Sequence, residues 1–130
     1  MRPLEGIKVL DLSRVLAGPF AGRILHDLGA EVVKVEPPEG DVTRNWGKVR
    51  AGLAGYYTQQ NVGKRNICID LGAEGGAELI RRLAAEADVL IENFRPGIMK
   101  KFGLAYEDLR SINEKLVMLS ISGFGQEGPE

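Results

Sequence analysis

The residues best suited to bind a ligand form a short run, Asn93-Phe94-Arg95-Pro96-Gly97, directly after an apolar segment. Asn offers amide hydrogen bonds, Phe a flat apolar wall, Arg a forked set of donors, and Pro-Gly a tight redirection of the chain. Lys100 and Lys101 add two cations about one helical turn later. This combination is more specific than any of its parts, and it predicts a ligand-binding edge.

A second candidate is the run SRVLAGPF at residues 13–20, which lies between a predicted strand and a predicted helix. Such a turn can present free backbone N–H groups and the positive end of a helix to an anion or a carbonyl group. It lacks the GxGxxG spacing of a dinucleotide fingerprint, so an ordinary β–α turn remains an open interpretation.

The segment 37–65 combines five cationic side chains, two carboxylates and three aromatic rings without a clear period. The cations are Arg44, Lys48, Arg50, Lys64 and Arg65, and the other residues are Glu39, Asp41, Trp46, Tyr56 and Tyr57. A local excess of positive charge beside aromatic rings could hold phosphates and a stacked base. A solvated loop explains the same composition and is slightly favoured.

Glu36 closes a predicted strand where a Rossmann domain places the acid that binds a ribose hydroxyl. An NAD-binding module therefore stays open, although a solvated strand end is the favoured interpretation. Cys68 is expected to be a small buried residue, and His26 to lie on the surface. Asp11 and Asp70 are expected to bond nearby backbone amides. We find no catalytic pair, triad or metal-ligand set in the sequence.

The elements that must position these residues alternate between strands and helices. We predict strands at 7–12, 31–36, 66–71, 88–92 and 116–121, and helices at 19–28 and 73–87 with short turns near 99 and 106–112. This order predicts an α/β fold with a Rossmann-like, doubly wound, mostly parallel sheet. The last strand should be central, so the following SGFGQEGPE suggests that the chain breaks off within a site and that the domain is incomplete.

Composition restricts the partners of the protein. The net charge of −1 offers no global attraction to nucleic acid or to an anionic membrane. No apolar run has the length of a membrane span, and the first residues lack the apolar core of a signal peptide. The single cysteine excludes an internal disulfide. We therefore expect a cytoplasmic protein without a metal.

Four blocks of the sequence occur in the order found in one enzyme family. They are PLEGIKVLDLSRVLAGPFAGRILHDLGAEVVKVEPPEGD, GKRNICIDL, ADVLIENFRPGIMKKFGL and SISGFGQEGP. Together they resemble the N-terminal segment of the family III CoA-transferases, a superfamily with formyl-CoA transferase, carnitine CoA-transferase and 2-methylacyl-CoA racemase. The resemblance covers essentially all of residues 1–130. It implies the N-terminal part of a CoA-binding large domain, without the small domain and the C-terminal return segment, and an interlocked homodimer for the intact protein.

The resemblance also implies a set of residues that contact coenzyme A. They are Val15, Leu16 and Ala17 through backbone groups, Ile69, Asp70 and Leu71 beside the coenzyme, Asn93, Phe94 and Arg95 along it, and Lys101 at a phosphate. Two positions depart from the family pattern. Pro37 and Pro38 stand where a basic residue often follows, and Lys101 stands where arginine is common.

The implied reaction transfers CoA between an acyl-CoA thioester and a carboxylic acid through an aspartyl intermediate. The family's nucleophilic aspartate lies downstream of the GFGQ-G-P segment, so we expect no catalytic residue in this chain and no activity of the chain alone. A racemase fragment, a non-catalytic NAD-type module and a structural subunit completed by a partner chain remain the alternatives.

Overall fold

The computed structural model describes residues 1–128, and Pro129 and Glu130, the last two residues of the SGFGQEGPE segment, lie outside the described residues. Its centre is a sheet of five strands in the order β5-β2-β1-β6-β7, with every neighbouring pair parallel. The strands are β1 (Lys8–Asp11), β2 (Glu31–Glu36), β5 (Arg65–Cys68), β6 (Val89–Glu92) and β7 (Val117–Ser120). This order runs outward from β1 in both directions, as in a doubly wound fold. The predicted fold class is confirmed, and all five predicted strands are present. β2 has the predicted bounds, the other four are shorter, and β5 begins one residue earlier than predicted.

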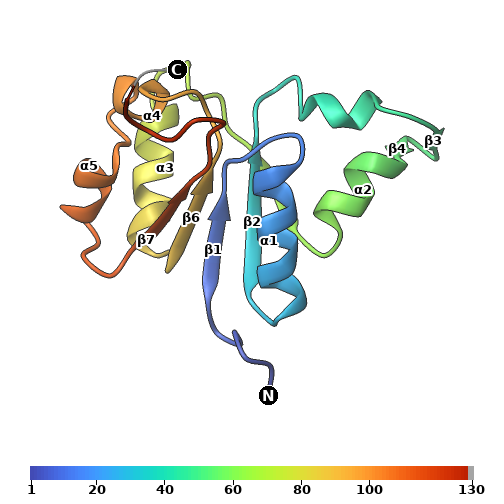
Figure 1. Cartoon of the computed structure of the whole chain (residues 1–130), viewed down its shortest axis with the longest axis horizontal. Coiled ribbons are helices and arrows are strands. Elements are labelled where there is room, and N and C mark those ends of the chain that lie inside the picture. Colours follow the sequence, from blue (N-terminus) through green and yellow to red (C-terminus); the bar gives the residue numbers. More distant parts are fainter. Residues whose placement is uncertain (129–130) are drawn as a thin grey trace.

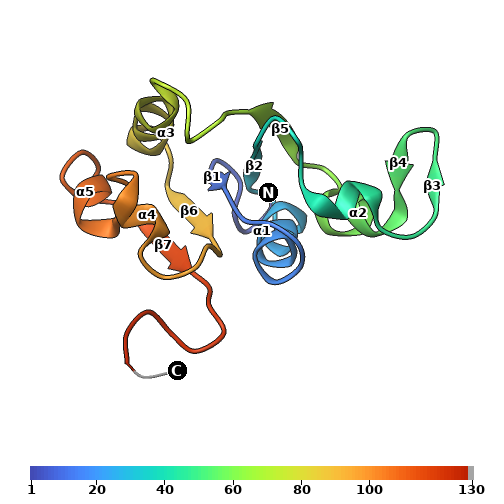
Figure 2. The ribbon, with the colours of Figure 1, turned by 90° about the horizontal axis from the view of Figure 1, so that it is seen from above.

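Helices cover both faces of the sheet (Figures 1 and 2). Helix α1 (Ala17–Asp27) lies on one face. Helices α3 (Gly76–Ala85), α4 (Ile98–Lys101) and α5 (Tyr106–Arg110) lie on the other. Each crossover returns the chain to the same end of the sheet, so the loops that follow the strands meet at one edge.

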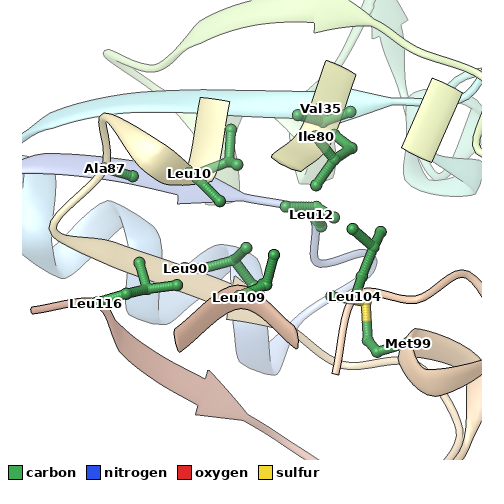
Figure 3. Close-up of a cluster of buried hydrophobic side chains, with 11 residues drawn as sticks. Leu10, Leu12, Val35, Ile80, Ala87, Leu90, Met99, Leu104, Leu109 and Leu116 are labelled. Carbon is green, nitrogen blue, oxygen red and sulfur yellow. The ribbon is translucent and has the colours of Figure 1, made fainter. Parts of the chain in front are cut away.

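The strands are apolar on both faces because each face packs against a helical layer. Leu10 and Leu90 from the sheet belong to the larger core with Ile80 of α3 and Leu109 of α5. Figure 3 shows Leu90 beside Leu109, and Ile80 beside Val35 of β2. Val9, Val32 and Ile91 form a smaller cluster on the opposite face, with Leu25 of α1 packed against it. Neighbouring residues of a strand thus serve different cores, which is the period of two expected for a sheet.

The segment 37–65, which the sequence predicts to be irregular, contains four short elements. They are the 3₁₀ helix η1 (Val42–Asn45), the hairpin strands β3 (Val49–Arg50) and β4 (Leu53–Ala54), and helix α2 (Gly55–Asn61). Each is too short to show a period in the sequence. The hairpin turns at Ala51 and Gly52, which both have positive φ, as a tight two-residue turn requires.

Strand β7 lies at an edge of the sheet that residues 1–128 form. It pairs with β6, and Val117 and Leu119 on it are 61% and 40% exposed. The predicted central position concerns the complete domain and stays a prediction. Within the described residues, no helix is both long and apolar enough to cross a membrane.

Candidate functional site

The loops that follow β1, β2, β5 and β6 surround a hollow of about 370 Å³ at the carboxyl edge of the sheet. Its lining consists of Leu12, Arg14, Val35, Pro37, Glu39, Ile69, Asp70, Leu71, Gly72, Phe94, Arg95, Ile98 and Phe102. Apolar side chains predominate among these residues, and two arginines and two carboxylates join them. In open α/β sheets this edge is where ligands bind.

A second hollow of about 730 Å³ lies beside the first, between the loop after β6 and the loop after β7. Asn93 to Pro96 form one side of it, and Ser122 to Gly128 form the other. Phe94 and Arg95 line both hollows. The Asn93–Gly97 run therefore stands between two adjoining spaces, which agrees with its prediction as a ligand-binding edge.

Phe94 is fixed from both ends by neighbouring groups. Its backbone N–H donates to the buried carboxylate of Glu92 at 2.9 Å, and the guanidinium of Arg14 lies 5.4 Å from the centre of its ring. A cation over an aromatic face is attracted by the electrons of the ring. Arg14 is a residue that the sequence did not single out, and it brings a positive charge to the hollow.

The β1–α1 turn, residues 12–16, is held by side chains from three other segments. Asn93 binds the Arg14 peptide twice, accepting from its N–H at 2.8 Å and donating to its carbonyl at 2.7 Å. The N–H of Ser13 donates to Asp11 at 2.9 Å, and the N–H of Val15 donates to Asp41 at 3.2 Å. The expectation of free N–H groups is therefore wrong for these three residues.

The turn leads into α1 at Leu16, which has no side-chain cap. The first N–H groups of a helix have no intrahelical acceptor and carry a partial positive charge. Gly18 lets this end pack closely against the turn, because a Cβ there would lie 2.1 Å from the Cβ of Ser13. The uncapped helix start at Leu16 and Ala17 is thus the part of the predicted turn that remains suited to a ligand.

Acidic residues at the strand ends hold the chain that follows them. Asp11 closes β1 and accepts from Ser13, and Glu92 closes β6 and accepts from Phe94. Asp70, just beyond β5, accepts from the N–H of Gly72 at 2.8 Å. The predicted backbone-bonding roles of Asp11 and Asp70 are confirmed.

Glu36 is buried, so the interpretation of it as a solvated strand end is wrong. Arg44 donates to both of its oxygens at 2.7 and 2.8 Å, and Tyr57, Asn66 and the N–H of Asp41 donate as well. Burial by itself raises the pKa of Glu36, but these donors outweigh it and lower the pKa to about 2. The carboxylate is therefore occupied by protein groups, which removes the basis for its predicted ribose role.

Part of the cationic segment 37–65 also faces inward. Lys64 donates to Asp11 at 2.7 Å, with both side chains almost fully buried. Burial lowers the pKa of Lys64, and the adjacent Asp11 opposes that shift. The ring of Trp46 packs on Tyr56 with centroids 5.4 Å apart. The buried Lys64 and Tyr57, and the engagement of Arg44 by Glu36, argue against the alternative of a phosphate and base site in this segment.

Two further expectations concern single residues. Cys68 is exposed, so its prediction as a buried residue is wrong, because β5 is the opposite edge strand. His26 is half-buried and packs on Gly63, where a Cβ would lie 2.0 Å from the ring. Lys34 is a buried residue that was not predicted, although a lysine within the apolar strand EVVKVE indicates a buried partner.

The structure gathers six of the ten residues predicted to contact a coenzyme around the two hollows. They are Ile69, Asp70, Leu71, Asn93, Phe94 and Arg95. Val15, Leu16 and Ala17 lie on the adjoining turn, which Asn93 holds through Arg14. Lys101 is exposed at the last residue of α4. Apolar walls beside cationic side chains can bind a ligand that combines flat or aliphatic parts with negative charge.

Comparison with known proteins assigns the chain. The family model described as CoA-transferase family III matches residues 4–130. A succinate–glutarate CoA-transferase of Agrobacterium fabrum is 53% identical over 98% of this chain and 34% of its own length. The succinyl-CoA:glutarate CoA-transferase of Homo sapiens is 48% identical over 99% of this chain and 30% of its own length.

Solved structures agree with these relatives. The crystal structure of a CAIB/BAIF family protein from Brucella suis superposes with a TM-score of 0.93 at 53% identity, covering 98% of this chain and 35% of that one. The chain thus spans about a third of the length of the curated relatives it matches. The family match, the strand order and the ligand-suited edge agree, and the chain belongs to CoA-transferase family III.

Proposed function

We propose that this chain provides the coenzyme-binding part of an enzyme that transfers CoA between an acyl-CoA thioester and a carboxylic acid. The family match over residues 4–130 carries this proposal. The hollows at the carboxyl edge of the sheet support it, because most of the residues that the family resemblance assigns to coenzyme binding line them.

In the proposed complex, the apolar hollow formed by Ile69, Leu71 and Phe94 takes a flat or aliphatic part of the coenzyme. Arg14 and Arg95 at this hollow, with Lys101 beyond it, attract the phosphates. The helix start at Leu16 and Ala17 adds backbone donors. Asp70 lies beside the ligand without approaching its phosphates, since like charges repel.

The chemical step needs a carboxylate that attacks the thioester carbonyl and expels the CoA thiolate, forming a mixed anhydride. Asp11, Glu36 and Glu92 are buried and bonded to protein donors, so they are unsuited to this attack. The family resemblance puts the nucleophilic aspartate downstream of the GFGQ-G-P segment, so we place it outside residues 1–130 and propose that the chain alone binds CoA without turnover.

The two curated relatives are named for succinate and glutarate, so succinyl-CoA with glutarate is the first substrate pair to test. These names favour a transferase over a racemase. The engagement of Glu36 by Arg44, Tyr57 and Asn66 argues against the NAD-type module.

Binding can be tested by titrating the purified chain with CoA and with NAD while following thermal unfolding and the heat of binding. A ligand that binds the native state raises its melting temperature. We expect CoA to stabilise the chain, and Arg95→Met, but not the control Arg110→Met on α5, to weaken this effect. Stabilisation by NAD and not by CoA would contradict the proposal.

CoA transfer and dimer formation are to be measured on the full-length protein that the gene encodes. We expect that protein to exchange CoA between succinyl-CoA and a carboxylic acid, and to sediment as an interlocked homodimer. Exchange catalysed by the 130-residue chain alone would contradict the position proposed for the nucleophile.

A further inference from the structure

Lys34 and Asp41 form an ion pair inside the protein. Their Nζ and Oδ2 atoms are 3.0 Å apart, and their side chains are 1% and 0% exposed. Burying two charges is costly unless further hydrogen bonds satisfy them, so a pair of this kind needs an explanation beyond packing. Lys34 belongs to β2, whereas Asp41 precedes η1 and caps it through the N–H of Thr43.

Both members of the pair also bind the β1–α1 turn. Lys34 Nζ donates to the carbonyl oxygen of Ser13 at 2.9 Å, and the N–H of Val15 donates to Asp41 Oδ2 at 3.2 Å. The other oxygen of Asp41 accepts from the N–H and the hydroxyl of Thr43 at 3.0 and 2.8 Å. The pair therefore ties the Ser13 carbonyl and the Val15 N–H of the turn to β2, where Lys34 is located.

Val15 is the place in this turn where the backbone needs such support. Its φ is +71°, a left-handed conformation that a β-branched residue rarely adopts. A conformation of this kind persists only where the surroundings impose it, and it is common at ligand sites. The bonds to the Ser13 carbonyl and the Val15 N–H lie directly before the Cα of Val15, and α1 begins at the next residues.

We infer that Lys34 and Asp41 are positioning residues that hold the β1–α1 turn in the conformation that binds coenzyme, without contacting the coenzyme themselves. The inference rests on the proposed function, because it assigns a purpose to the turn through Leu16 and Ala17. A preformed turn binds more tightly because its ordering cost is met during folding.

The test compares variants of the 130-residue chain in CoA titrations and in amide hydrogen exchange. Lys34→Met combined with Asp41→Asn removes both charges together and avoids leaving one buried charge without its partner. We expect this double variant to bind CoA about tenfold more weakly, since each lost hydrogen bond contributes modestly. We also expect faster exchange of the Val15 amide.

Tyr57→Phe is the matched control. It removes a hydroxyl that donates to Glu36 and accepts from Arg44 and Asn66 in the same polar region, and it does not touch the turn. We expect it to lower stability while leaving CoA affinity and Val15 exchange unchanged. The control therefore separates a loss of stability from a change in the conformation of the turn. If the Lys34–Asp41 pair only stabilised the fold, Tyr57→Phe and the double variant would affect CoA affinity and Val15 exchange alike.

A milder variant decides the matter if the double variant does not fold. Thr43→Val removes one donor to Asp41 with little change of shape, and we expect CoA binding to weaken about threefold. Unchanged affinity and unchanged Val15 exchange in the folded variants would overturn the inference. Failure of the unsubstituted chain to bind CoA would instead overturn the proposed function.

Discussion

At the scale of residues, the acids at the carboxyl edge act as acceptors for the chain around them. Asp11, Glu36 and Glu92 each close a strand, and each accepts a backbone N–H from the segment that follows. A carboxylate can accept several hydrogen bonds at once, so it can fix a loop at the point where ladder bonding stops. These acids hold the loops that form the hollows, and the ligand-facing charge is left mainly to Arg14 and Arg95.

Glu36→Gln should change how stability depends on pH. The folded pKa is about 2 against an ordinary value of 4.5, so the ionised form contributes about 3 kcal/mol above pH 5. Because the pKa is depressed on folding, this contribution is lost as pH falls from about 5 towards 2. We expect the variant to be less stable at pH 7 and its unfolding free energy to fall less steeply with acid.

Urea unfolding at several pH values between 7 and 3 measures this difference. Glu39→Gln, which removes an exposed carboxylate, is the control and should follow the parent curve. If the unfolding free energies of Glu36→Gln and the parent fell in parallel with decreasing pH, Glu36 would not be the acid whose protonation lowers stability.

At the scale of elements, the parts predicted well are those that local pattern determines. The type and order of β1, β2, β6 and α1 follow from local pattern. A central strand must be apolar on both faces, and a helix that packs on the sheet must carry one apolar stripe. Cys68 in β5 was misplaced because burial depends on whether a strand lies at an edge, which no local run reports.

The segment 37–65 was less predictable for a related reason. Its elements are short, and its purpose depends on partners that are distant in sequence, such as Lys64 with Asp11. The candidate site shows the same division. The Asn93–Gly97 run was recognisable from residue types, whereas the contribution of Arg14 depends on Phe94 lying beneath it.

Gly76→Ala tests whether the start of α3 shapes the wall of the hollow. A Cβ at Gly76 would lie 1.9 Å from the carbonyl oxygen of Asp70, so the loop carrying Asp70 and Leu71 must move. We expect a loss of about 1–3 kcal/mol in unfolding free energy together with weaker CoA binding.

The matched control is Gly55→Ala at the first residue of α2, where the nearest atom to a new Cβ is 4.0 Å away. Alanine suits a helix better than glycine, so this variant should be neutral or slightly stabilised. Calorimetric titration of both variants separates the effects. Normal CoA affinity in a folded Gly76→Ala variant would show that the position of this loop does not matter for binding.

At the scale of the whole molecule, charge is distributed so that binding of an anion depends on a local excess of positive charge. The net charge is −1, and several carboxylates near the site are neutralised internally by Lys34, Arg44 and Lys64. Arg14 and Arg95 at the first hollow are the cations left to meet a phosphorylated ligand, and Lys100 and Lys101 are exposed on α4. Exposed charges of this kind are screened by salt far more than buried ones.

CoA binding should therefore weaken as salt concentration rises, while the fold remains intact. The screening length shortens from about 10 Å at 0.1 M salt to about 3 Å at 1 M. The attraction of the half-buried Arg14 and the exposed Arg95 for phosphates therefore declines, whereas the buried Lys34–Asp41 pair is little affected. Pantetheine, which lacks the phosphates, should bind weakly and independently of salt. Titrations of both ligands over this range measure the slopes, and unfolding at the same salt concentrations checks the fold. If CoA affinity did not depend on salt, apolar contacts in the hollow would have to account for recognition, and the assignment of phosphate binding to Arg14 and Arg95 would fail.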